Sequence, residues 1–279
     1  MAVQRHLQGM MVRQGMTLSQ EFEVTHLTHC VTEEFANSLK TFRDSTFGYL
    51  PRECETFDCS VNTLGHLYYA AVIIERAKQI VRQPGSIIEF GSGYGNLARI
   101  FKHFLPETNL ILIDLPELLA LQYLFLRSEL PNADIIIEQS GTFTPKAGAI
   151  HLVPVHYMKE MTQKADLFVS TFALSETPAA LQLTAIEKRF FNSSLCYISG
   201  QLHGAAPEHG WVHHSYLQNG IRSCYPVAQI SPFHVFQNGV QLYSAIGTTT
   251  VGVPVGVSVG AQSVAQRLSE LLASNPRSS

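Results

Sequence analysis

The first eighty residues carry apolar positions at helical spacing. Between residues 19 and 43 aliphatic and aromatic residues recur every three or four positions, which predicts a helix, and Ser19 stands where its cap is expected. A second apolar stretch over 64–81 predicts another helix, which ends before the Pro-Gly pair at 84–85. We therefore expect the first part of the chain to be helical.

From residue 86 onward, short continuous apolar runs alternate with helical patterns. Strands of this kind are buried on both faces, so their alternation with helices predicts a parallel sheet covered on both sides. Later in the chain Asn238-Gly239 suits a two-residue turn, which predicts an antiparallel hairpin over 234–247. The predicted strands are 86–90, 109–114, 133–139, 149–155, 166–172 and 194–202, and the predicted helices are 96–104, 116–130 and 181–191.

Composition narrows the class of protein. The 279 residues are 46% apolar and 15% charged, which is typical of a chain with a sizeable core and argues against disorder. The net charge of −3 comes without a basic block, so we expect no nucleic-acid partner. No apolar run approaches the roughly 20 residues of a membrane span, so no membrane partner is expected. The odd number of cysteines, 5, favours a reducing compartment and predicts a cytoplasmic protein.

A glycine-rich turn, E-F-G-S-G-Y-G-N over residues 89–96, follows the first predicted strand. Glycine lets the backbone turn sharply and approach a ligand closely. A dinucleotide fingerprint needs G-x-G-x-x-G, whereas here the third glycine comes one residue early and Asn96 takes its place. The Glu89 carboxylate is unfavourable beside a pyrophosphate and suits a ligand that carries an ammonium and a sulfonium. The turn therefore predicts S-adenosylmethionine, with a purely structural turn and a NAD or FAD site as alternatives.

A second anchor for this ligand follows the next predicted strand. Asp114 lies 19 residues after Gly95, where a carboxylate can accept hydrogen bonds from both ribose hydroxyls of an adenosine. S-adenosylhomocysteine would be the product. The predicted cofactor contacts are Glu89, Gly91, Ser92, Gly93, Tyr94, Gly95, Asp114, Leu115, His156 and Ser170.

Three stretches of the chain resemble a known family. EFGSGYGNLARIF, IDLPELLALQYLFL and DLFVSTFALSE resemble the sugar O-methyltransferases among the class I S-adenosylmethionine-dependent enzymes, and the resemblance spans about residues 86–200. That family carries a similar glycine turn, a D-x-P-E-x-x-A-L-Q helix and an S-N-Y-A-F-S-E-L strand end. Thr171 stands where the family has Asn, and residues 199–201 depart from its Tyr-Asn pair. The matching residues are Pro116, Glu117, Ala120, Leu121, Gln122, Ser170, Ala173, Ser175 and Glu176.

The resemblance and the terminal hairpin together imply a particular fold and division of the chain. We expect an α/β protein with a doubly wound, Rossmann-like class I methyltransferase sheet, a terminal antiparallel hairpin and an N-terminal helical cap. The expected parts are the cap at 1–83, the S-adenosylmethionine-binding domain at 84–250, and a tail at 251–279 with a short helix. The tail would serve packing or dimerisation, so a homodimer stays open.

Two segments are expected at the carboxyl ends of strands, where an acceptor should bind. The segment 203–216 holds four histidines and the only tryptophan, Trp211, whose flat face suits a sugar ring. Removing a hydroxyl proton calls for a general base, and histidine titrates near neutral pH. We favour His203, followed by His213 and His214, while a solvated surface loop is the alternative.

The other segment, 171–177, contributes Glu176, which could orient an acceptor hydroxyl or the methionine amine; its alternative role is an acid at a helix N-terminus. Ser175 and Gln201 are further candidate acceptor contacts. His209 and His213 are four residues apart but lack a well-spaced third ligand, so no metal is predicted.

The expected activity is therefore methyl transfer from S-adenosylmethionine to an oxygen of a sugar or similar small biosynthetic acceptor. The alternatives are a natural-product N-, C- or phenol O-methyltransferase, and a catalytically silent module that binds the cofactor to recognise a partner.

Overall fold

The computed structural model describes residues 18–48, 51–80, 83–201, 214–235 and 241–249. Three helices precede the sheet: α2 (Leu18–His29), α3 (Glu33–Leu39) and α4 (Val61–Ile80). The single helix predicted over 19–43 is wrong, because Thr32 starts a new helix by accepting a hydrogen bond from the Phe35 N–H at 3.3 Å. Ser19 lies inside α2 instead of capping it.

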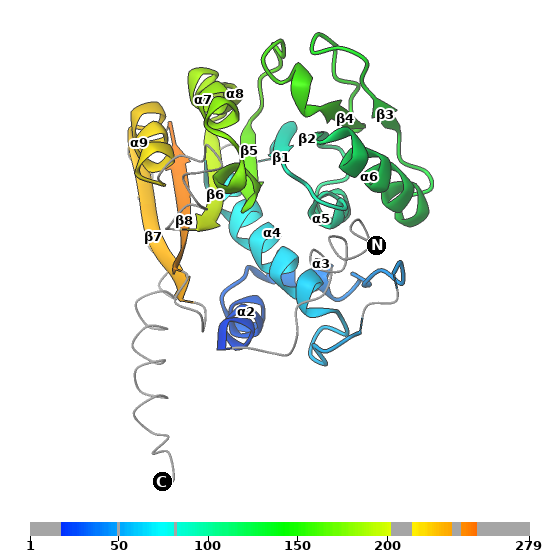
Figure 1. Cartoon of the computed structure of the whole chain (residues 1–279). Coiled ribbons are helices and arrows are strands. Elements are labelled where there is room, and N and C mark those ends of the chain that lie inside the picture. The colour runs from blue at the N-terminus through cyan, green and yellow to red at the C-terminus, as the bar shows by residue number, and fades with distance from the viewer. Residues whose placement is uncertain (1–17, 49–50, 81–82, 202–213, 236–240, 250–279) are drawn as a thin grey trace, which may run out of the picture.

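One sheet of eight strands is formed by the described residues, in the order β3-β4-β2-β1-β5-β6-β8-β7 (Figure 1). The strands from β3 to β6 are parallel, and β8 pairs antiparallel with both β6 and β7. The strands are β1 (Ser86–Phe90), β2 (Asn109–Asp114), β3 (Ile135–Ile137), β4 (Ile150–Pro154), β5 (Leu167–Thr171), β6 (Leu195–Gln201), β7 (Val227–Val235) and β8 (Gln241–Thr248).

Helices cover both faces of this sheet, as the continuous apolar strands predict. Alternate strand residues enter two different cores. One core joins the sheet to α4, α5 (Asn96–Phe104) and α6 (Pro116–Glu129), and includes Ile87, Leu112 and Val169. The other joins it to α7 (Ala179–Glu187), α8 (Arg189–Asn192) and α9 (His214–Cys224), and includes Ile88 and Phe168. Figure 1 shows α4 crossing the sheet between α2 and the strands.

Two further predictions need correction. The helix predicted over 181–191 ends at Glu187, because residues 189–192 have positive φ angles between 49° and 58°. The alternative interpretation of 203–216, a solvated surface loop, is wrong from His214 onward, where helix α9 begins. The hairpin is confirmed as the pair β7 and β8, with a longer first strand than predicted, while its turn at Asn238-Gly239 lies outside the described residues.

No helix within the described ranges combines the length and the hydropathy needed to cross a membrane.

Candidate active site

The order of the strands reverses at β1, which lies between β2 and β5. The chain leaves β1 toward α5 on one face of the sheet, and it leaves β5 toward α7 on the other face. In open α/β sheets a crevice opens where neighbouring connections diverge in this way, beyond the carboxyl ends of the strands. The glycine turn after β1 and the segment Thr171–Thr177 after β5 flank this point.

The glycine turn has a backbone that only glycine adopts easily. Gly91, Gly93 and Gly95 have φ angles of 76°, 59° and 96°. The N–H of Gly91 donates to the carbonyl of Ile113 at 2.8 Å, which fixes the turn to β2. A Cβ atom on Gly91 would lie 1.9 Å from the Cβ of Ala173, so the turns after β1 and β5 are in close contact. The predicted turn is therefore present at the switch point of the sheet.

Asp114 is held against this turn by three donors. Its Oδ1 accepts the N–H of Leu115 at 2.8 Å, and its Oδ2 accepts the N–H of Gly93 at 3.1 Å and Nε2 of Gln122 at 2.9 Å. Burial raises the pKa of Asp114 to about 6, and these hydrogen bonds oppose that rise by stabilising the carboxylate. The structure thus brings the two predicted anchors, the turn and Asp114, into direct contact.

Glu89 is the other carboxyl group beside the turn. It is 2% exposed, and its Oε2 has no hydrogen-bond partner among the described residues. Burial raises the pKa of Glu89 to about 8, and the nearby Asp114 carboxylate adds to this rise. A buried carboxyl group without a partner on one oxygen is costly, and a cation would relieve that cost. This chemistry fits the ammonium-bearing ligand that the sequence predicts.

Tyr94, in the middle of the turn, points into the protein. Its side chain is 4% exposed, its ring packs on Phe125 with centroids 5.0 Å apart, and its hydroxyl accepts a hydrogen bond from Asn62 at 2.9 Å. The neighbouring Asn96 donates to Thr63 at 3.0 Å. Helix α4 thus packs against the turn and holds it by hydrogen bonds. The sequence did not indicate these contacts, because Asn62 and Thr63 lie about 30 residues away.

The turn after β5 is held by its own side chains. Phe172 has φ 69° and ψ −39°, and its N–H donates to the Ser199 carbonyl at 2.8 Å. The buried Ser175 donates to the Phe172 carbonyl at 2.6 Å, and the buried Ser170 accepts the N–H of Leu174 at 3.0 Å. The hydroxyl groups of two predicted contacts, Ser170 and Ser175, therefore already serve the turn. Glu176 is exposed at the end of η2 (Ala173–Glu176).

Two other predicted cofactor contacts lie at the same edge. Leu115 follows β2 and is 54% exposed, unlike the core residues before it. His156 is exposed in the short helix η1 (Val155–Tyr157) that follows β4, with its ring 4.1 Å from that of Tyr157. Because Asp114 and Pro154 are register partners at the ends of β2 and β4, both residues follow neighbouring strand ends.

Most of the predicted acceptor residues cannot be placed. His203, Trp211 and His213 lie outside the described residues. Gln201 ends β6 and His214 begins α9, so the backbone of each is placed while its side chain is not described. Their roles stay predictions. Within the described ranges no cluster of three or more His, Cys, Asp or Glu side chains could hold a metal ion.

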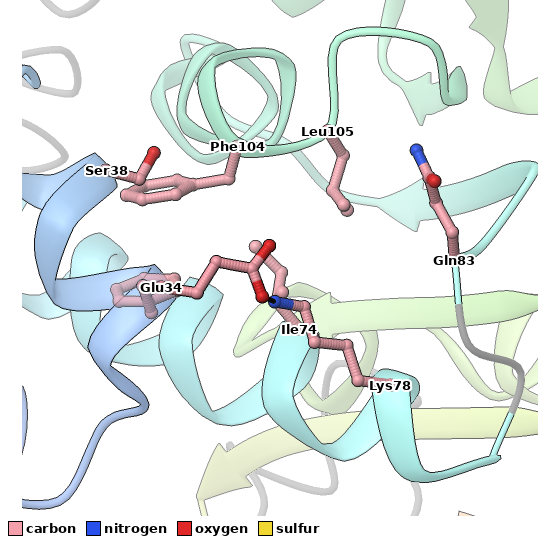
Figure 2. Close-up of a pocket in the computed structure, with 8 residues that line it drawn as sticks. Glu34, Ser38, Ile74, Lys78, Gln83, Phe104 and Leu105 are labelled. Atoms are coloured by element: carbon pink, nitrogen blue, oxygen red, sulfur yellow. Dashed lines mark hydrogen bonds and ion pairs between the residues drawn. The ribbon is translucent and has the colours of Figure 1, made fainter.

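A separate pocket of about 400 Å³ lies between α3, α4 and the end of α5 (Figure 2). Its rim carries the ion pair of Lys78 with Glu34 at 2.6 Å, and its lining includes Phe35 and Phe104. It also includes Gln83 and Leu105, which precede β1 and β2. The pocket is therefore at the amino ends of the strands, away from the glycine turn.

No protein-family model and no curated protein matches the chain. Similar solved structures include an O-methyltransferase family protein from Burkholderia thailandensis, with 10% identity, a TM-score of 0.43, and coverage of 71% of this chain and 61% of that chain. Magnesium protoporphyrin IX methyltransferase from Synechocystis PCC 6803 has 7% identity, a TM-score of 0.47, and coverage of 85% and 100%. An amino pentose methyltransferase from Micromonospora echinaspora has 12% identity, a TM-score of 0.40, and coverage of 64% and 90%.

The class of the fold rests on the strand order itself. Parallel strands wound outward in both directions from β1, with an antiparallel pair at one end, confirm the predicted doubly wound, Rossmann-like sheet of the class I methyltransferase type. The helices α2 to α4 precede it in the chain.

Proposed function

We propose that the protein is an S-adenosylmethionine-dependent methyltransferase. The observation that carries this proposal is the contact of Asp114 with the glycine turn at the switch point of the sheet, through the N–H of Gly93. A carboxylate in this position suits the hydroxyl groups of a ribose, and the glycine backbone leaves room for a ligand beside it. The bound cofactor would supply an electrophilic methyl group on a sulfonium.

The charge around the turn favours this cofactor over a dinucleotide. The Glu89 carboxyl is buried at the end of β1. A pyrophosphate would add negative charge beside the Asp114 carboxylate and would disfavour the ionised form of Glu89, whereas the methionine part of S-adenosylmethionine brings an ammonium and a sulfonium, which favour that form. Burial strengthens both the repulsion and the attraction, because the local dielectric constant is low.

We further propose that the acceptor is a hydroxyl group of a sugar or similar small molecule. The support is the sequence resemblance over 86–200 and the histidine-rich segment that follows β6. In this reading His203 removes the hydroxyl proton, with His213 and His214 as alternatives, Trp211 carries the apolar side of the acceptor, and Glu176 orients it. Holding the acceptor in line with the methyl group would supply much of the rate acceleration. A nitrogen, carbon or phenol acceptor and a silent binding module remain the competing functions.

Calorimetry with S-adenosylhomocysteine tests the cofactor. We expect the wild type to bind it and Asp114→Ala to lose about 1.5–3 kcal/mol, or roughly tenfold or more in Kd, because a charged acceptor is removed. Asp134→Ala is the matched control. Asp134 is an exposed partner of Lys146 and lies directly before β3, away from the glycine turn. Equal affinities in wild type and Asp114→Ala would contradict the site, and tight NAD binding would contradict the function.

Turnover separates an enzyme from a silent module. We expect purified protein, given methyl-labelled S-adenosylmethionine and a cell extract, to label a small molecule that mass spectrometry identifies. His203→Ala should then lower kcat by about 10²–10⁴-fold, the usual effect of a positioned base, without changing the Kd of the cofactor. The wild-type rate should rise with pH through the histidine range, because the neutral imidazole is the active form. If His203→Ala, His213→Ala and His214→Ala all keep full activity, the proton leaves by another route.

A further inference from the structure

Gln122 on α6 joins the two halves of the candidate cofactor site. Its side chain is 0% exposed, and its Nε2 lies 2.9 Å from the carbonyl oxygen of Gly93 and 2.9 Å from Oδ2 of Asp114. One amide group thus binds the middle of the glycine turn and the carboxylate at the end of β2. The residue matches the family motif in the sequence, but nothing in the sequence assigns it a role.

The orientation of this amide follows from its surroundings. Both neighbours, the Gly93 carbonyl and the Asp114 carboxylate, accept hydrogen bonds, so the group between them must be the NH₂ and not the oxygen. Oε1 of Gln122 is left buried without a partner among the described residues. This orientation places both amide hydrogens on acceptors but leaves the amide oxygen unsatisfied. A buried unsatisfied oxygen costs folding free energy, so we expect the two hydrogen bonds to contribute to the function of the site.

We propose that Gln122 is a positioning residue that holds the Asp114 carboxylate in one orientation against the glycine turn before the ligand arrives. The inference rests on the proposed function, in which Asp114 receives the ribose. A carboxylate that is already ordered does not lose rotational freedom on binding, so binding costs less. Gln122 does not need to touch the ligand for this effect.

The same hydrogen bond affects the acidity of Asp114. Burial raises the pKa of Asp114, and hydrogen-bond donors lower it: Gln122 is the side-chain donor, and Leu115 and Gly93 are backbone donors. The Asp114 carboxylate also interacts electrostatically with Glu89 on the adjacent strand. Removing the Gln122 donor should therefore raise the pKa of Asp114, whereas filling the same space with an apolar side chain should not restore it.

Three variants test the inference. Gln122→Met keeps the volume and removes both donors, and Gln122→Glu keeps the shape but turns an oxygen toward two acceptors. Gln163→Met is the matched control, because Gln163 is 8% exposed and donates to the Phe143 carbonyl at 2.8 Å, in the segment before β5 and away from the glycine turn. Calorimetry gives the Kd of S-adenosylhomocysteine between pH 5 and 8, and carboxyl ¹³C NMR gives the pKa of Asp114 in the ligand-free protein.

We expect Gln122→Met to weaken binding about tenfold at pH 7, Gln122→Glu to weaken it further, and Gln163→Met to leave it unchanged. The pH below which affinity falls should move upward in Gln122→Met, together with the pKa of Asp114. Wild-type affinity and an unshifted Asp114 pKa in Gln122→Met would overturn the inference. If the wild type itself fails to bind S-adenosylhomocysteine, the proposed function fails, and the NMR titration still decides whether Gln122 holds the carboxylate.

Discussion

The turns that follow β1 and β5 meet at the centre of the sheet, yet they are built in opposite ways. The first turn adopts its positive φ angles with glycines, but leaves Oε2 of Glu89 and Oγ of Ser92 buried without partners among the described residues. The second turn forces Phe172 into a positive φ angle, while the hydroxyl groups of Ser170 and Ser175 are both hydrogen-bonded within it. One turn has a relaxed backbone and unsatisfied polar atoms, and the other has a strained backbone and satisfied ones.

This difference indicates different tasks. Buried polar atoms are normally paired, so a turn with two unpaired oxygens suits a ligand that would pair with them. A strained backbone persists only where its surroundings hold it, and such strain gathers at functional sites. The first turn therefore suits the cofactor, and the second suits a fixed side chain, Phe172, at the edge of the acceptor side.

The largest expected effect comes from giving the first turn a side chain. In Gly91→Ala the new Cβ would lie 1.9 Å from the Cβ of Ala173, at a φ of 76°. Overpacking costs about 1–3 kcal/mol and a left-handed backbone about 1–2 kcal/mol, so we expect a loss of about 2–5 kcal/mol in the free energy of unfolding. Urea denaturation measures it. Adding Ala173→Gly should recover the overpacking part alone, and a double variant no more stable than Gly91→Ala would show that the two turns do not meet there.

A smaller effect of opposite sign, a gain in the free energy of unfolding, is expected from Glu89→Gln. Burial raises the pKa of Glu89 to about 8, so the folded, ligand-free protein holds this group protonated at pH 7 while the unfolded chain has it ionised. Stability is therefore lost as the pH rises from about 4.5 to about 8, and at ~1.4 kcal/mol per pKa unit the loss at pH 7 is on the order of 3 kcal/mol. Glu89→Gln removes this loss, so it should be more stable than the wild type by an amount that grows with pH.

The same variant should bind S-adenosylmethionine more weakly, because it lacks the carboxylate that the cation favours. Thermal denaturation at pH 5, 6, 7 and 8 and calorimetry at pH 7 provide the two measurements. A Glu89→Gln protein whose stability follows that of the wild type at every pH would show that Glu89 is ionised in the empty site, and the contrast between the two turns would then lose its main support.

The sequence predicts the parts of this site that have local signals. The glycine turn and Asp114 each follow an apolar strand, and these strands are continuous enough to be located. The contacts of Asn62 and Gln122 with the turn could not be predicted, because they depend on how α4 and α6 pack beside it. Local sequence patterns therefore predict the glycine turn and Asp114. The side chains that hold them in place, Asn62 and Gln122, are brought there by tertiary packing.

The errors in the helices have equally specific causes. Helix α9 places Leu217 and Ile221 in the core at helical spacing, but Asn219-Gly220 is typical of a turn. Gly220 is needed because a Cβ there would lie 2.4 Å from Cδ1 of Ile186 on α7. In the N-terminal region the apolar period continues across the break at Thr32, so periodicity alone could not detect two helices.

The smallest expected effect isolates the strain in the second turn. Phe172 has φ 69° and ψ −39°, a conformation that glycine adopts far more readily than any residue with a Cβ. Phe172→Ala and Phe172→Gly both remove the ring and its contact with Tyr69, at 6.5 Å between centroids, so they differ in the Cβ atom alone.

At an ordinary position the alanine variant is the more stable by about 0.4–1 kcal/mol. Here we expect the glycine variant to be the more stable by about 1 kcal/mol, since a strained backbone costs ~1–3 kcal/mol. Urea denaturation of the two proteins gives this difference directly. If the alanine variant is the more stable, the backbone of the turn after β5 is not strained. Strain at Phe172 then gives no reason to place that residue on the acceptor side of the site.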